Sequence, residues 1–249
     1  MTMVKLSDSL PSEEQVLRRI VRAIQKAVEE DLLDYYHNNR METMNSLRFI
    51  RSDMINENLK NIVVDDSIRL LSFKRFSWEG RMLVDDNNII TYTITTHQNL
   101  IAISKKKNRK QPHFLQSIFA IENGDLEGDN AQTTIFPMES FDRNTLEEDY
   151  RKIVSGLLSP DSGYRHYVIT YEYDRFQVTD IRLILSDKSF NTVDEISLNN
   201  LMKPNFGNLT NIVSESDDET STSKPAKGLV ALKPGIKPDL IKLQEEDQA

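Results

Sequence analysis

The strongest constraint on the fold is a stretch of alternating residues between Tyr167 and Leu185. Two arms, 167–173 and 178–185, flank the turn-forming segment 174–177. The apolar positions of one face are Tyr167, Ile169, Tyr171, Tyr173, Ile181, Leu183 and Leu185. Because successive side chains of a strand point to opposite faces, this pattern predicts an antiparallel hairpin with one buried and one partly solvated face.

The N-terminal segment predicts helices instead. Ser12 to Gln15 match a capping box, in which the Ser12 hydroxyl accepts a hydrogen bond from the Gln15 N–H. Apolar residues then recur with helical spacing over residues 16–35, and the helix is expected to end near Asn38. A second helix is expected over residues 41–60. The short connection predicts that the two helices pack as an antiparallel pair.

The middle of the chain alternates between strand-like and helix-like segments. A further hairpin is expected around the turn Asp85–Asn88, and Trp78 is expected to anchor the core. The other expected elements are helices from His97 onward, over 112–121 and over 144–158, and a short strand over 133–136. The sequence therefore predicts an α+β fold: an N-terminal helical segment (1–60), and an α+β body (61–203) with a mainly antiparallel sheet built from two hairpins with intervening helices.

Residues 204–249 differ in composition from the rest of the chain. They contain no aromatic residue after Phe206, and they carry the acidic, serine-rich run 214–219. This composition predicts a disordered tail. A short apolar motif within it is expected to bind a protein partner, as a helix in a groove or as an added strand; the alternative is a solubilising extension. The motif residues are Leu229, Val230, Leu232, Ile236, Leu240, Ile241 and Leu243.

Composition and motifs argue against several functional classes. The 249 residues carry a formal net charge of −8 and no Cys, which excludes disulfides, thiolate catalysis and sulfur-ligated zinc. No apolar run approaches the roughly 20 residues of a membrane span, so a cytoplasmic protein is expected. The sequence contains no glycine-rich phosphate loop and no H-E-x-x-H motif, and its four His are isolated. We therefore expect no catalytic residues, no metal and no cofactor.

One set of carboxylates invites comparison with metal-dependent nucleases. Asp161, Glu172 and Asp174 flank or occupy the first arm of the 167–185 hairpin. A restriction-type nuclease needs its Asp and Glu on adjacent strands so that both reach Mg²⁺. Here an extended strand, at about 3.3 Å per residue, separates Asp161 from the other two. These residues are therefore expected to be a turn Asp and solvent-facing strand residues.

Two basic segments are candidates for nucleic-acid contact. The first is the run Lys105, Lys106, Lys107, Arg109 and Lys110; the second is Lys74 and Arg75 between Phe73 and Trp78. Clustered cations gain affinity for phosphates by releasing counterions, and aromatic residues beside them can stack on bases. The alternatives are a solvated helix end for the run, and core aromatic residues with exposed cations for the second segment. Phe73 and Phe76 cannot share one face of a regular strand, which argues against a continuous aromatic platform.

The second segment also carries a resemblance. Lys74–Trp78, the strand Met82–Val84, Ile90–Thr93 and the helix-like His97–Ile103 resemble an uncharacterised domain family of low-GC Gram-positive bacteria and their phages or mobile elements. The resemblance covers about residues 60–190 and leaves out the tail. The resemblance implies no activity and supplies no catalytic residue.

These observations predict a non-enzymatic interaction or regulatory protein of such a bacterium or its phage, which binds a protein partner through its body and tail. The alternative is a nucleic-acid-binding protein, including a divergent Mg-dependent nuclease in phage defence or counter-defence.

Overall fold

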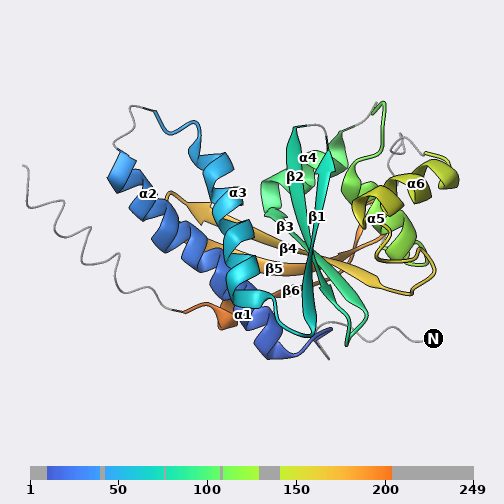
Figure 1. Cartoon of the computed structure of the whole chain (residues 1–249), viewed down its shortest axis with the longest axis horizontal. Helices are drawn as coiled ribbons and strands as arrows, with labels where there is room; N and C mark the ends of the chain where they lie inside the picture. The colour runs from blue at the N-terminus through green and yellow to red at the C-terminus, as the bar shows by residue number, and fades with distance from the viewer. Residues whose placement is uncertain (1–9, 40–42, 76, 107–108, 129–140, 204–249) are drawn as a thin grey trace, which may run out of the picture. The chain divides into compact units, whose positions relative to one another are not determined.

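Six strands form one sheet at the centre of the computed structural model, which describes residues 10–39, 43–75, 77–106, 109–128 and 141–203 (Figure 1). The strands lie in sequence order: β1 (Ile68–Arg75), β2 (Trp78–Asp85), β3 (Ile90–Thr96), β4 (Arg165–Asp174), β5 (Gln177–Ser186) and β6 (Thr192–Ser197). Neighbours are antiparallel except β3 and β4, which run parallel. The sheet therefore consists of two antiparallel meanders joined by a single parallel pair.

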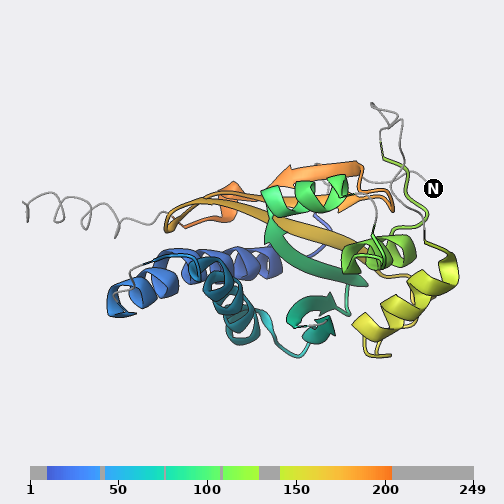
Figure 2. The same cartoon turned by 90° about the horizontal axis from the view of Figure 1, so that it is seen from above.

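The long connection between β3 and β4 supplies the helices of one face. They are α4 (His97–Lys105), α5 (Phe114–Glu122) and α6 (Arg143–Ile153). The N-terminal helices cover the opposite face (Figure 2). A parallel pair needs a long crossover of this kind, because the chain must return to the starting end of the sheet.

The N-terminal helices contain two π-helical turns. One helix comprises α1 (Glu14–Gln25), the π-turn η1 (Lys26–Asp31) and α2 (Leu32–Asn39); the other comprises α3 (Leu47–Asn58) and η2 (Leu59–Val63). The start of the first helix packs on the end of the second, and α2 packs on α3. This arrangement is the predicted antiparallel pair, although the second helix begins later than residue 41 and extends further.

The predicted capping box at the start of α1 is wrong. Glu13 is the N-cap residue and makes no side-chain cap. The Ser12 hydroxyl instead donates to Asp85 Oδ2 at 2.5 Å and accepts a hydrogen bond from the Tyr92 hydroxyl at 2.7 Å. Ser12 therefore ties the start of the helix to β2 and β3 and is not available to the Gln15 N–H.

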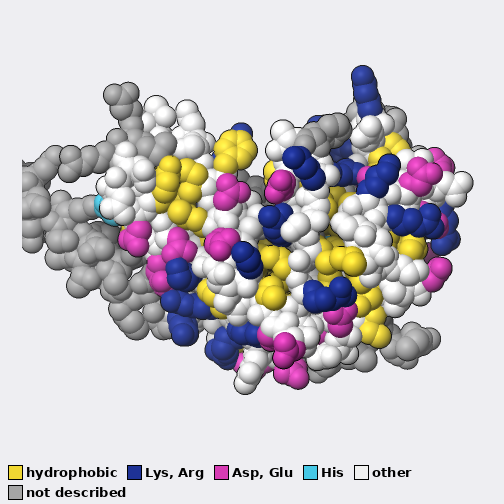
Figure 3. All heavy atoms as spheres, in the orientation of Figure 1, with side chains coloured by type: hydrophobic (Ala, Val, Ile, Leu, Met, Phe, Trp, Pro, Cys, Tyr) yellow, Lys and Arg dark blue, Asp and Glu magenta, His cyan; other side chains and the backbone are white. Residues whose placement is uncertain are grey.

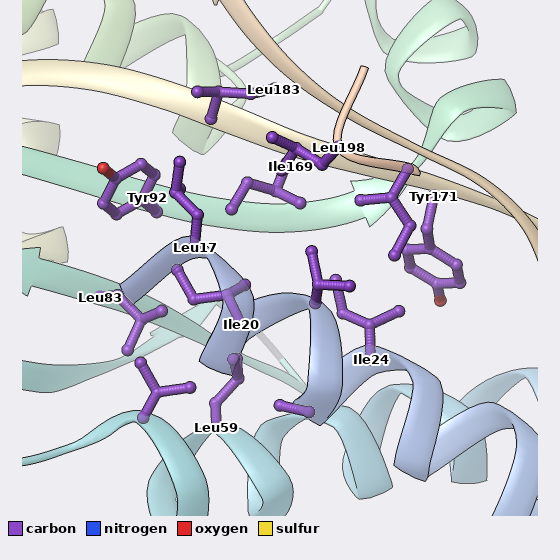
Figure 4. Packing of buried hydrophobic residues seen from close by; sticks show 14 of the residues in the cluster. Leu17, Ile20, Ile24, Leu59, Leu83, Tyr92, Ile169, Tyr171, Leu183 and Leu198 are labelled. Atoms are coloured by element: carbon purple, nitrogen blue, oxygen red, sulfur yellow. The ribbon is translucent and has the colours of Figure 1, made fainter. Parts of the chain in front are cut away.

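The predicted apolar faces form the core between the N-terminal helices and the sheet (Figure 4). Leu17, Ile20 and Ile24 of α1 are fully buried against Ile169 and Leu183 of the β4–β5 hairpin. On the opposite face of the same strands, Val168 and Ile184 pack against α4 and α5. At these positions both faces of the hairpin are thus buried, whereas the sequence predicts that one face is partly solvated.

The α+β class is confirmed, with N-terminal helices and a mostly antiparallel sheet. Strand β6 and the short 3-10 helix η3 (Asn199–Leu201) were not predicted. The predicted strand 133–136 and the tail 204–249 lie outside the described residues. Among the helices that are described, none combines the length and the apolar character that crossing a membrane requires.

Candidate nucleic-acid interface

Three aromatic rings from two distant segments, Phe73, Trp78 and Phe114, pack together. Phe73 lies near the end of β1 and Trp78 at the start of β2, and these are the upper ends of the two strands in Figure 1. Trp78, at the start of β2, stacks on Phe114, at the start of α5, with ring centroids 5.3 Å apart and an interplanar angle of 28°. The Phe73 ring packs edge-on against Trp78 at 5.7 Å. Phe73 is buried, whereas Trp78 is 44% exposed. The expectation that Trp78 anchors the core is therefore wrong, because its partner Phe114 covers only part of the indole.

Gly80 makes room for this stack. A Cβ atom at Gly80 would lie 2.3 Å from Cζ of Phe73 and 2.7 Å from Cη2 of Trp78. Both rings therefore rest directly on the backbone of β2, opposite Phe73 in the register of the β1–β2 pair. A larger residue here would displace the rings, so the position of Trp78 depends on glycine.

Cations from the two predicted basic segments converge on the same place. The ring centroid of His113 lies 4.4 Å from that of Phe114, and the pKa of His113 responds to the charge of these cations. Burial, and then the positive charges of Arg109, Arg75 and Lys106, lower the pKa of His113 to about 3. A neutral His113 is free to cap α5, where its Nδ1 accepts a hydrogen bond from the Leu115 N–H at 3.2 Å. We call Phe73, Trp78, His113, Phe114, Arg75, Lys106 and Arg109 the aromatic–basic surface.

Two of these cations are held in place by other parts of the chain. Arg75 donates to the Pro112 carbonyl at 2.7 Å and forms an ion pair with Asp149 of α6. Arg109 donates from Nη2 to the Ile103 carbonyl at 2.6 Å. Its Nη1 is buried and has no hydrogen-bond partner among the described residues, and burial lowers the pKa of this guanidinium. The guanidinium of Arg109 therefore has donor capacity that the protein's own acceptors do not use.

The other predicted contact residues are placed less favourably. Lys74 is exposed and neighbours Phe73 along β1, so it points to the opposite face of the hairpin. Lys105 and Lys110 are exposed, and Lys107 lies outside the described residues. Figure 3 shows Lys and Arg side chains around the upper ends of β1 and β2, with hydrophobic side chains close by.

Sequence reasoning missed His113 and Phe114. The sequence predicts only that Phe114 lies within the helix expected over 112–121, and Phe114 is 36 positions after Trp78. No local pattern links the two residues, because the crossover between β3 and β4 brings them together. One strand considered alone argues against an aromatic platform, whereas the observed stack combines aromatic rings from two segments of the chain.

A second polar cluster lies deep between the sheet and α5. Thr91 of β3 contacts both Glu122 and His166: its hydroxyl is hydrogen-bonded to the Glu122 carboxyl and lies 2.7 Å from His166 Nδ1. Thr93 lies 2.9 Å from His166 Nε2, and the Tyr150 hydroxyl donates to Glu122 at 2.7 Å. Burial raises the pKa of Glu122 to about 7 and lowers the pKa of His166 to about 3. Because these side chains are closed to solvent, a substrate has no access to them.

A polar cavity of about 290 Å³ lies beside the start of α1 and the β2–β3 turn. Its buried wall is Asp85, which accepts hydrogen bonds from Ser12 and from the Asn88 N–H and amide. At its rim, Asp65 forms an ion pair with Arg19 at 2.7 Å. These two carboxylates are engaged by the protein's own donors. Among the lining residues this leaves the exposed Glu13, and a single surface carboxylate does not make a ligand site.

The nuclease-like carboxylates do not form a site. Asp161 lies in an exposed turn before β4, whereas Glu172 and Asp174 lie at the other end of that strand. Within the part of the chain that the structure describes, no three His, Asp or Glu side chains are grouped so as to hold a metal ion.

A family model matches residues 9–248 of the chain. The chain belongs to DUF5986, a family of unknown function. The DUF5986 match extends well beyond the 60–190 region of the sequence resemblance and includes most of the 204–249 segment. Neither the curated proteins nor the solved structures yielded a match to the chain.

Proposed function

We propose that this protein binds nucleic acid through the aromatic–basic surface. The observation that carries the proposal is the 44% exposed indole of Trp78, which stacks on Phe114. Phe114 in turn packs on His113, where Arg75 is held by the Pro112 carbonyl and the charges of Lys106 and Arg109 act. Exposed aromatic rings next to Arg and Lys are the side chains with which proteins stack bases and neutralise phosphates.

The charge of the whole chain opposes binding to nucleic acid, because a protein of net charge −8 repels a polyanion. Binding therefore needs a local positive region. Lys106 and Arg109 supply one, whereas the charge of Arg75 is balanced by Asp149. The protein-partner function predicted from the tail motif stays a prediction, because residues 204–249 lie outside the described part of the chain.

The test measures binding and its salt dependence on the full chain. Fluorescein-labelled DNA and RNA oligonucleotides, single- and double-stranded, are titrated with protein at several salt concentrations, with and without Mg²⁺. The variant carries Lys105→Gln, Lys106→Gln and Lys110→Gln, three exposed changes with little effect on stability. Each lost phosphate contact should lower the slope of log K against log salt by about 0.7 to 0.9.

The matched control is Lys60→Gln with Lys188→Gln, two exposed lysines on other parts of the molecule. The control should bind like the wild type. Equal affinity and equal salt slope for the triple variant and the control would contradict the proposal. Cleavage of the oligonucleotides only when Mg²⁺ is present would instead point to the nuclease alternative.

A further inference from the structure

We infer that the aromatic–basic surface takes an unpaired base of a single strand, stacked on the exposed face of Trp78. This inference rests on the proposed function and adds the class of nucleic acid. DNA and RNA share the aromatic base face and the phosphate that this geometry recognises.

The arrangement of the rings leaves one stacking surface. Phe114 covers one face of the indole at 5.3 Å, and Phe73 approaches it edge-on with an interplanar angle of 72°. Nevertheless, 44% of Trp78 is exposed. We assign this exposed area to the indole face opposite Phe114, and a face of this kind accepts one further ring, which extends the stack beyond Trp78.

Duplex nucleic acid cannot use this surface in the same way. Inside a double helix each base is already covered on both faces by its neighbours, so a protein ring reaches a base face only where the strand is unpaired. An exposed indole that serves a duplex would have to act as a wedge between base pairs, and it would then need to project freely from the surface. Trp78 instead stacks on Phe114, and the Cη2 edge of its ring lies against the backbone at Gly80.

The rings are already packed on one another in the protein alone. Phe73 is 5% exposed, and the two rings are seated on Gly80. Binding of a base therefore orders few additional side chains, and this lowers the entropic cost of association.

Phosphate contacts beside the aromatic–basic surface are available from the exposed Lys106, whose charge acts on His113 next to Phe114. Arg109 adds its charge, while its buried Nη1 and the hydrogen bond from Nη2 to the Ile103 carbonyl keep its guanidinium within the protein. Phe73, Gly80 and Phe114 are positioning residues in this scheme, since they orient Trp78.

The experiment uses the fact that Trp78 is the only Trp in the chain. Intrinsic fluorescence of the full chain is recorded during titration with oligothymidylate, with oligouridylate and with a DNA duplex of equal length. We expect both single strands to quench Trp78, and the duplex to bind at least about tenfold more weakly with little quenching. A difference between the DNA and RNA strands would show whether the 2′-hydroxyl contributes.

Three variants test the role of the ring. Trp78→Ala should weaken single-strand binding by roughly 5- to 150-fold, the range observed for loss of one stacked base, as measured with the labelled oligonucleotides. Trp78→Phe retains an aromatic face and should recover most of the affinity. Phe49→Ala removes an aromatic side chain that is more exposed than Trp78 and lies on α3; it should leave binding unchanged. Circular dichroism establishes that each variant is folded.

Failure of the inference is distinguishable from failure of the proposed function. If single strands and duplex bind equally, without quenching, while the lysine variant still lowers the salt slope, then nucleic-acid binding stands and base stacking is overturned. If no oligonucleotide binds, the proposed function is overturned as well. Full affinity of Trp78→Ala for single strands would also overturn the inference.

Discussion

Glu122 Oε2 lies 3.8 Å from Nδ1 of His166 in the interior, and burial moves the pKa values of these two residues in opposite directions. The pKa of Glu122 rises from 4.5 to about 7, an increase that the charge of Arg165 and the hydrogen bonds from Thr91 and Tyr150 only partly oppose. The pKa of His166 falls from 6.5 to about 3. Between about pH 3 and pH 7, the folded protein thus keeps the proton on the carboxyl group and leaves the imidazole neutral.

The pair itself should contribute no net pH dependence to the free energy of unfolding between about pH 4.5 and 6.5. His113, whose pKa is also lowered, adds the same slope to the wild type and to each variant, so the variants are compared with the wild type. In that window the unfolded chain holds one proton on His166 and none on Glu122, whereas the folded chain holds one on Glu122 and none on His166. Equal numbers of bound protons give no slope. Glu122→Gln removes the proton that the folded state binds at Glu122. The free energy of unfolding of this variant should therefore rise with pH across the window, relative to the wild type, by up to about 1.4 kcal/mol per pH unit. Urea denaturation at a series of pH values measures this; parallel curves for the two proteins would refute the assignment.

The opposite slope is expected for His166→Asn. With the imidazole gone, the raised pKa of Glu122 acts alone, and the folded state binds the extra proton between pH 4.5 and 7. Stability relative to the wild type should therefore fall as the pH rises from 4.5 to 6.5. Near neutral pH the variant should also be less stable than the wild type, because Thr91 and Thr93 lose their buried partner. At pH 4.5 this loss should be offset, because the variant no longer holds a buried imidazole without its proton. The same urea series measures both effects, and a slope of the same sign as that of Glu122→Gln would contradict the prediction.

Gly80→Ala should destabilise the protein by about 1 to 3 kcal/mol, since the added methyl group overlaps the Phe73 and Trp78 rings. The displaced indole should also shift the fluorescence emission of Trp78. Ser72→Ala, at an exposed position of the neighbouring strand β1, is the matched control and should change neither quantity. Wild-type stability and emission for Gly80→Ala would show that the rings do not rest on the glycine.

Glu29→Ala tests the contact between η1 and the β4–β5 hairpin. The buried Glu29 carboxylate accepts a hydrogen bond from the Val178 N–H at 3.0 Å, close to the register shift at Glu172 and Tyr173. Its loss leaves a buried donor without an acceptor and should cost about 1 to 3 kcal/mol in chemical denaturation. Glu30→Ala breaks only a partly exposed ion pair with Arg22 and should cost less than about 1 kcal/mol. Equal losses for the two variants would contradict a special role for Glu29.

The sequence predicts best those helices and strands whose pattern of apolar residues arises locally, from the burial of one face. The period of 3.6 over residues 16–35 and the period of two over 167–185 are local consequences of burying one face, and both are found in the structure. Strand β6 has no such signal, because its residues are exposed or half-buried and do not alternate clearly.

Interactions between distant segments explain the errors. The Ser12 hydroxyl matches a helix cap by its spacing, yet Asp85 and Tyr92 provide partners that no local pattern reveals. The same holds for the candidate site. The sequence identified the cations and Trp78, but the exposure of Trp78 depends on Phe114, which reaches it only through the crossover between β3 and β4.

The single parallel pair has a consequence for how the molecule folds and opens. Each meander closes through short turns, but β3 and β4 pair only after residues 97–164 have formed a loop, and long-range closure of this kind is slow. We call the boundary between β3 and β4 the seam; Thr91 and His166 are partners across it in the register of the pair. The seam should therefore form last during refolding. In native-state hydrogen exchange, opening between β3 and β4 should expose amides of both strands together, while the two meanders stay protected as separate cooperative units.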